Sequence, residues 1–145
     1  MTDVRSASAA DQERSIDEWM QSWSAHDLDG VVRLLTPDAV FEDVTMGSVN
    51  RSAAEVRAFG EGFLSGFPDV TFTATSRFAN GTRGGAEWVM RGTHRGDLPG
   101  MPATGKQIEI RGVSMFEFAG DRIRRCSDYW DMATLLKQLG MMPSA

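Results

Sequence analysis

Asp128 is the acidic residue of this chain whose setting first suggests chemistry. It lies in the run RRCSDYWDM, residues 124–132, which alternates as a β-strand does. The alternation places Asp128 on the same face as Cys126 and Trp130. Burial on an apolar face disfavours the ionised carboxylate and raises its pKa towards neutrality. A carboxyl group in that range can take up and return a proton, so we expect Asp128 to be a general acid/base.

A structural role is the alternative for the same residue, with Asp128 as one partner of a buried ion pair and no part in chemistry. Cys126 does not compete as a nucleophile, because a reactive thiolate needs a lowered pKa and a base beside it. It is the only cysteine of the chain and cannot form an internal disulfide. We expect Cys126 to be a buried, small apolar residue.

Length and composition limit the classes of function. The 145 residues carry 15 basic and 20 acidic side chains, a net charge of −5 that argues against a phosphate-binding surface. The one dense basic cluster, RIRRC, belongs to a strand and fits a solvated or inter-strand role. No apolar run is long enough to span a bilayer. We expect one domain over residues 13–142, a disordered tail over residues 1–12, a cytoplasmic location, and neither nucleic acid nor membrane as a partner.

The first half of the chain has mainly helical periodicity. Helical spacing forms one apolar face from Ile16, Trp19, Met20 and Trp23. Further on, the patterns predict a short helix at 30–35, a strand at 39–44 and an amphipathic helix at 52–66. Residues typical of helix ends are Asp27 or Asp29, Ser52, Asp131 and Gly140.

The second half alternates as strands do. Four runs, at 70–78, 85–94, 107–118 and 121–131, are separated by turn residues, and a short helix at 132–140 ends the pattern. Helices followed by a meandering sheet predict the α+β class. We expect a curved antiparallel sheet, shaped as a cone-like barrel, with three N-terminal helices on its concave face and a short C-terminal helix.

A pocket between the helices and such a sheet would be the site of chemistry. The tryptophans, among them Trp88, would give it a flat apolar lining suited to a polycyclic ligand. The run GMPATGKQ has the glycine and lysine spacing of a phosphate loop, but it leads into a strand and lacks Ser or Thr after the lysine. His26 and His94 have no neighbours at metal-ligand spacing. We therefore expect no cofactor and no metal.

The run EWVMRGTHRGDLPGMPATGKQIEIRGVSMFEFAGDRIRRCSDYWDMATLLKQLG resembles the C-terminal half of a SnoaL-like polyketide cyclase domain. This group belongs to the nuclear-transport-factor-like superfamily of cone-shaped folds, with ketosteroid isomerase and limonene-epoxide hydrolase. The resemblance extends over roughly residues 15–140 and includes the strand PDAVFEDV. It implies the cone-shaped fold and a homodimer, whereas the superfamily contains enzymes, ligand carriers and scaffold domains.

Several residues match functional positions of these families. Asp128 matches the general acid/base of the cyclases, Asp43 the base of ketosteroid isomerase, and Arg91 the arginine beside the acid pair of epoxide hydrolase. Arg91 would then hold Asp128 ionised. His94 could donate to or accept from a developing enolate, although strand parity points it away from the pocket unless a bulge intervenes. Pocket-wall positions are matched by Met20, Trp23, Ile110, Ser114, Phe116 and Trp130.

The resemblance implies an acid/base enzyme that needs no cofactor and acts on a small apolar or polycyclic keto compound. In cyclases of this type, a base removes a proton next to a carbonyl, and the enolate attacks a second carbonyl of the same molecule. Two specialised mechanisms are incomplete, because Thr93 replaces the second acid of epoxide hydrolase and Ser114 the oxyanion-hole acid of ketosteroid isomerase. The alternatives are an epoxide hydrolase of the limonene-epoxide type and a non-catalytic ligand-binding or dimerisation domain.

Overall fold

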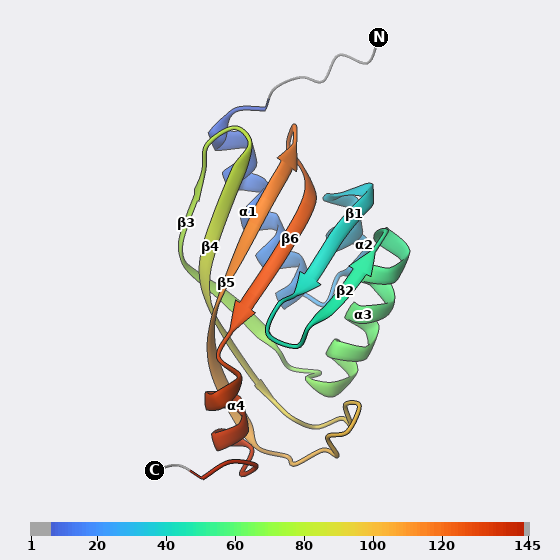
Figure 1. The fold of residues 1–145 in the computed structure, drawn as a ribbon, viewed down its shortest axis with the longest axis vertical. Coiled ribbons are helices and arrows are strands. Elements are labelled where there is room, and N and C mark those ends of the chain that lie inside the picture. Colours follow the sequence, from blue (N-terminus) through green and yellow to red (C-terminus); the bar gives the residue numbers. More distant parts are fainter. Residues whose placement is uncertain (1–6, 144–145) are drawn as a thin grey trace.

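A computed structural model describes residues 7–143 of the chain. It has the predicted α+β architecture, in which helices cover one face of a single curved sheet (Figure 1). The elements in chain order are α1 (Ala9–Ser24), α2 (Leu28–Arg33), β1 (Leu35–Asp43), β2 (Ser48–Arg51), α3 (Ala53–Gly66), β3 (Thr71–Ala79), β4 (Arg83–Thr93), β5 (Gln107–Ala119), β6 (Arg122–Trp130) and α4 (Met132–Gln138).

The six strands form one sheet in the order β2-β1-β6-β5-β4-β3. The sheet does not close into a barrel, because β2 and β3 remain its two edges. Four of its strand pairs are antiparallel, as predicted, but β1 and β6 run parallel. The sheet, predicted as antiparallel, is therefore a mixed one with a single parallel pair. Because β1 and β6 are far apart in the chain, no hairpin turn fixes their relative direction.

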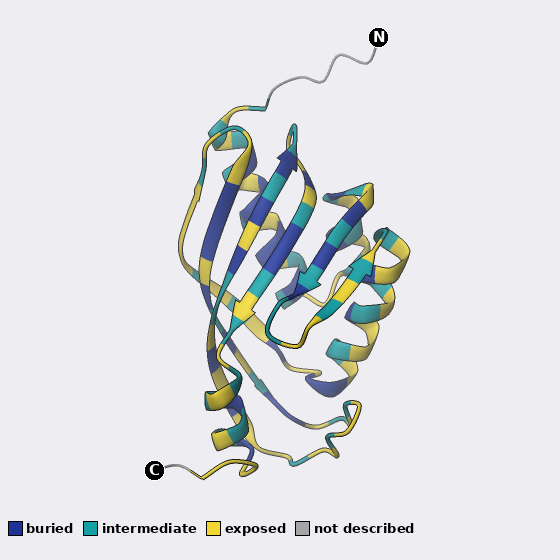
Figure 2. Ribbon diagram, in the orientation of Figure 1, coloured by how far each residue is buried: buried dark blue, intermediate teal, exposed yellow. Residues whose placement is uncertain are grey.

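The helices α1, α2 and α3 lie on one face of the sheet, which we call the inner face, and α4 lies at one end of the sheet (Figure 1). α1 passes behind the strands, and α3 lies beside β1 and β2 (Figure 1). The Trp19 ring of α1 lies 6.1 Å from that of Phe41 and 6.3 Å from that of Phe116, measured between centroids. Buried segments alternate with exposed ones along β4, β5 and β6, as expected for a sheet with one covered face (Figure 2).

The first helix begins earlier than the sequence predicted. α1 starts at Ala9, and the Ser8 side chain accepts a backbone N–H of its first turn. Residues 9–12 are thus helical, although they fall in the predicted tail over 1–12. Residues 1–6 of that tail lie outside the described part of the chain.

Gln12 explains why this first turn is ordered. Its side chain is fully buried and connects α1 to two turns of the sheet. The amide nitrogen donates to the carbonyl oxygens of Gly81 and Gly120, each at 2.9 Å, and the amide oxygen accepts the Gly81 N–H at 2.9 Å. The polar composition of this turn predicted a disordered tail, but its tertiary hydrogen bonds hold it in a helical conformation.

The predicted helix ends are confirmed. Asp27, rather than Asp29, caps α2, Ser52 caps α3, and Asp131 caps α4, each by accepting a backbone N–H of the first turn. Gly140 follows α4 with a φ of 77°, the left-handed conformation that glycine adopts without strain.

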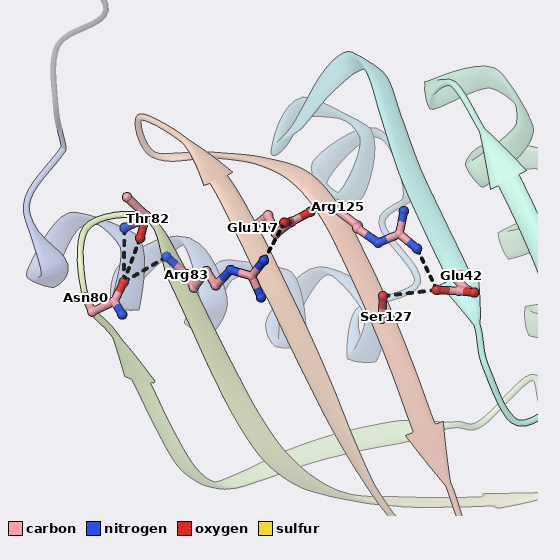
Figure 3. Close-up of polar contacts among 7 residues, drawn as sticks. All are labelled: Glu42, Asn80, Thr82, Arg83, Glu117, Arg125 and Ser127. Atoms are coloured by element: carbon pink, nitrogen blue, oxygen red, sulfur yellow. Dashed lines mark hydrogen bonds and ion pairs between the residues drawn. The ribbon is translucent and has the colours of Figure 1, made fainter.

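The opposite, outer face of the sheet carries a row of alternating charges. Arg83 pairs with Glu117 on the next strand, and Arg125 pairs with Glu42 (Figure 3). Ser127 also donates to Glu42, at 3.3 Å. Arg125 belongs to the basic cluster RIRRC, so its predicted inter-strand role is confirmed. No helix within residues 7–143 is long and apolar enough to cross a membrane.

We expect Gln12→Leu to lower the free energy of unfolding by about 2–3 kcal/mol, because it leaves buried backbone groups of two turns without partners. Urea denaturation measures the effect. Gln21→Leu is the matched control, since Gln21 lies exposed on the same helix. Equal effects of the two substitutions would contradict the anchoring role of Gln12.

Candidate active site

Asp128 lies on the inner face of β6, half-buried, with two donors on one of its oxygens. Ser114 of β5 is its register partner and places Oγ 2.5 Å from Asp128 Oδ1. The Cys126 thiol, two residues earlier on β6, contacts the same oxygen at 3.4 Å. The predicted shared face of Cys126 and Asp128 is therefore confirmed, and Cys126 is fully buried as expected.

Trp88 fixes the direction of the hydrogen bond from Ser114. Its indole Nε1 lies 2.9 Å from Ser114 Oγ, and both groups are buried. An indole N–H is a donor only, so the serine oxygen accepts from Trp88 and gives its own proton to Asp128. Gly112 makes this possible, because a Cβ there would lie 2.3 Å from the Trp88 ring. Trp88, Ser114 and Asp128 thus form a directed chain of hydrogen bonds across three strands.

Asp43 lies beside Asp128 on the neighbouring strand. The two residues are register partners in the parallel pair of β1 and β6, so their side chains share the inner face. Asp43 is only 8% exposed. Its Oδ1 accepts the Trp130 indole N–H at 2.9 Å and the Met46 backbone N–H at 2.9 Å. The site is therefore a pair of carboxylates, each held through one oxygen.

The second oxygen of each carboxylate accepts no hydrogen bond from any side chain or backbone group within residues 7–143. Neither Oδ2 atom is a fully buried orphan. A proton taken up by Asp128 would reside on Oδ2, because Oδ1 already accepts two donors. Oδ2 is therefore the oxygen available for proton transfer.

Burial raises the pKa of Asp128 from 3.8 to about 6. The hydrogen bonds from Ser114 and Cys126 oppose this rise, and the negative charge of Asp43 adds to it. At pH 7 about a tenth of such a group is protonated. Burial also raises the pKa of the Cys126 thiol, followed by the effect of the Asp128 charge, so the thiol stays a donor. The carboxyl group of Asp128 can act as a base and then as an acid at neutral pH.

Arg91 does not belong to this site. It lies exposed on the outer face and pairs with Glu109 at 2.6 Å, so the predicted ion pair with Asp128 is wrong. The reason is alternation along β4. Trp88 and Met90 point to the inner face, so the next residue, Arg91, points to the outer face.

His94 is fully buried, in contrast to the parity argument that pointed it away. It has the parity of Trp88, and its ring stacks on Phe67 at 5.4 Å. Its Nδ1 lies 3.1 Å from Thr104 Oγ1. His94 follows the end of β4, eight residues beyond Ala86, the partner of Ser114, which is roughly 26 Å along a straight strand. The structure does not bring His94 and Asp128 together.

The residues predicted to line a pocket wall all lie on α1 or on the strands β4, β5 and β6. Buried side chains of this set are Met20, Trp23, Trp88, Ile110, Ser114 and Phe116. Trp130 is partly buried at the end of β6. Its indole donates to Asp43, a role that alternation along one strand could not predict.

Among the surface hollows of residues 7–143 are two that neither Asp128 nor Asp43 lines. The larger, of about 610 Å³, lies between β4, β5 and α4 and includes Arg91 and Glu109. The smaller, of about 230 Å³, lies beside α1 and the turn before β6. The pocket predicted over Asp128 therefore stays a prediction. Within residues 7–143, no three His, Cys, Asp or Glu side chains are grouped to hold a metal ion.

We expect Ser114→Ala to raise the pKa of Asp128 above about 6, because the serine hydroxyl stabilises the ionised form. Carboxyl ¹³C NMR titration measures the midpoint. Ser127→Ala is the matched control, since Ser127 bonds to Glu42 on the outer face. An unchanged or lowered midpoint in Ser114→Ala would contradict the chain of hydrogen bonds.

Comparison with known proteins assigns this chain to a family. The family model described as SnoaL-like polyketide cyclase matches residues 14–139. No curated protein matches the chain.

Solved structures agree on the fold. AclR, a candidate hydroxylase from Streptomyces galilaeus, is 26% identical with a TM-score of 0.83, over 95% of this chain and 90% of that chain. IdmH, a candidate polyketide cyclase from Streptomyces antibioticus, is 26% identical with a TM-score of 0.77, over 89% and 98%. A protein from Catenulispora acidiphila with the ketosteroid isomerase-like fold, 16% identical, has a TM-score of 0.78 over 88% and 93%. On the match that spans most of its length, the chain belongs to the SnoaL-like polyketide cyclase family.

Proposed function

We propose that this protein is a cofactor-independent acid/base enzyme of the cyclase or isomerase type, acting on a small apolar or polycyclic keto compound. The observation that carries the proposal is the carboxyl group of Asp128, whose pKa is raised to about 6 on a face covered by aromatic side chains. A second carboxylate, Asp43, is its register partner on the neighbouring strand. Membership of the SnoaL-like family supports this class of reaction.

The proposed reaction begins when Asp128 Oδ2 removes a proton from the carbon next to a ketone. The C–H electron pair moves into the enolate, and Asp128 becomes neutral. In an isomerase, Asp128 returns the proton to another carbon of the same molecule. In a cyclase, the enolate carbon forms a C–C bond to a second carbonyl carbon, and the resulting alkoxide takes the proton from Asp128. Either cycle regenerates the carboxylate.

Asp43 supports this step through its charge. As the neighbour of Asp128 it raises the pKa of that group, which makes Asp128 a stronger base. Trp130 and Met46 hold Asp43 in place through Oδ1. Asp43 can also relay a proton through its own free oxygen, as a second acid/base.

The two alternatives have less support. Epoxide hydrolysis of the limonene-epoxide type relied on an arginine beside Asp128, and Arg91 is engaged with Glu109 on the outer face. A non-catalytic domain would have no need of a carboxylate at this position, because a buried charge costs free energy of folding. AclR shows that members of this fold are also assigned other chemistry, so family membership alone does not choose the reaction.

The homodimer stays a prediction. Apolar side chains exposed on the outer face support it, since Phe78 is 52% exposed, Met115 38% and Tyr129 50%. Phe78 and Met115 are neighbours, because both lie within about 3 Å of the position that a Cβ on Gly85 would occupy. A second copy could cover this patch.

The test uses β-tetralone, a bicyclic ketone, in D₂O. We expect the protein to accelerate deuterium uptake at the carbon next to the carbonyl, and Asp128→Asn to lower the rate at least about hundredfold, because the amide cannot act as the base. Proton NMR measures the exchange.

Asp38→Asn is the control, since Asp38 lies exposed on β1, the strand of Asp43, and makes no hydrogen bond through its side chain within the described residues. A wild-type protein without catalysis, or equal rates for wild type and Asp128→Asn, would contradict the proposed function.

A further inference from the structure

Asn50 of β2 carries a buried donor that nothing in the described protein satisfies. Its amide nitrogen Nδ2 is inaccessible and lies within hydrogen-bonding distance of no acceptor in residues 7–143. Buried polar groups in folded proteins are almost always hydrogen-bonded, so an orphan of this kind calls for an explanation. One explanation is that a bound ligand supplies the missing acceptor.

The register of the sheet places Asn50 on the inner face, near the carboxylate pair. Asn50 lies directly opposite Phe41, and Ser48 lies directly opposite Asp43. Side chains of opposite residues share a face, and the Phe41 ring contacts that of Phe59 on α3 at 5.2 Å. The amide of Asn50 is thus beside aromatic rings, on the same side of the sheet as Asp43.

Asn50 and Asp43 are diagonal neighbours in this antiparallel pair. Diagonal positions have Cα atoms about 7–8 Å apart. No hydrogen bond between the two side chains is found within the described residues. Side chains at this spacing can approach one small molecule together, the amide donating to a carbonyl oxygen while the carboxylate faces the carbon next to it.

The backbone after Asn50 is held in an unusual conformation. Ser52 has φ 89° and ψ 153°, a region that residues other than glycine rarely adopt. Its N–H donates to the Ala39 carbonyl oxygen at 2.8 Å, and the N–H of Arg51 donates to the Glu55 carboxylate at 2.9 Å. These bonds fix the junction of β2 and α3, and with it the place of Asn50.

We propose that the Asn50 amide binds the carbonyl oxygen of the substrate whose neighbouring carbon is deprotonated at the Asp43–Asp128 pair. This rests on the proposed function and adds a substrate-binding donor to it. As the proton leaves the carbon, negative charge develops on the oxygen, and the hydrogen bond from Asn50 becomes stronger. The substrate is therefore a ketone whose oxygen points towards β2 and whose acidic carbon faces β1 and β6.

The experiment compares two ligands of one shape, β-tetralone and the hydrocarbon tetralin, by quenching of tryptophan fluorescence. We expect the wild-type protein to bind the ketone more tightly than the hydrocarbon. Asn50→Leu, of similar volume, should weaken ketone binding roughly five- to tenfold and leave tetralin binding unchanged. The rate of deuterium exchange should fall at least as far. Asn50→Ser, which keeps a donor, should restore part of the preference for the ketone.

Arg51→Leu is the control for disturbance of the edge strand, because Arg51 lies exposed on the other face of β2. Unchanged ketone binding in Asn50→Leu, or equal losses for both ligands, overturns the inference, as does a wild type that holds the ketone no better than tetralin. If Asp128→Asn abolishes exchange and Asn50→Leu does not affect it, the proposed function stands without Asn50. If neither the wild type nor any variant catalyses exchange, the proposed function fails, and the comparison of β-tetralone and tetralin binding still tests the role of Asn50.

Discussion

The desolvation of one carboxylate is the constraint on which this site depends. Asp128 occupies the face of the sheet that the helices and their aromatic side chains cover, where water solvates an ionised oxygen poorly. The donors Ser114 and Cys126 replace part of the lost solvation, and the adjacent Asp43 opposes ionisation further. Their balance sets the pKa at about 6, which suits a group that must both accept and return a proton near neutral pH.

The fold serves this balance through register. A single rung of the sheet brings together Asp43 on β1, Asp128 on β6, Ser114 on β5 and Ala86 on β4. The parallel pairing of β1 with β6 is the link that sets two carboxylates side by side from distant parts of the chain. On the next rung the Trp88 ring lies over a glycine and reaches Ser114, so an aromatic residue of the core also helps to orient the carboxyl group of Asp128.

Alternation along β6 was enough to predict which of its residues share the inner face. It placed Cys126, Asp128 and Trp130 together, and the helix and turn signals predicted the order of the elements except for the edge strand β2, which was not predicted. Alternation carries no information on register, so neither the bond from Trp88 to Ser114 nor that from Trp130 to Asp43 could be predicted.

A family pattern accounts for one residue that the sequence analysis misplaced, and long-range contacts account for others. Arg91 matched a catalytic arginine by its position in a family pattern, yet its own parity puts it on the outer face with Glu109. Gln12 seemed part of a tail because its partners, two turns of the sheet, follow far along the chain. Asn50 gave no signal at all, since an amide on an edge strand is ordinarily solvated, and the burial of its Nδ2 depends on tertiary packing.

The pH dependence of folding stability tests the central claim most directly, by comparing wild type with Asp128→Asn in urea between about pH 4 and pH 7. The folded protein binds a proton on Asp128 more tightly than the unfolded chain, with a pKa of about 6 against 3.8. The unfolding free energy of the wild type should therefore fall, relative to the variant, as pH rises through this window, by roughly 1–3 kcal/mol, and level off above it. Parallel curves, or a wild type that gains stability over the variant as pH rises, would contradict a desolvated Asp128.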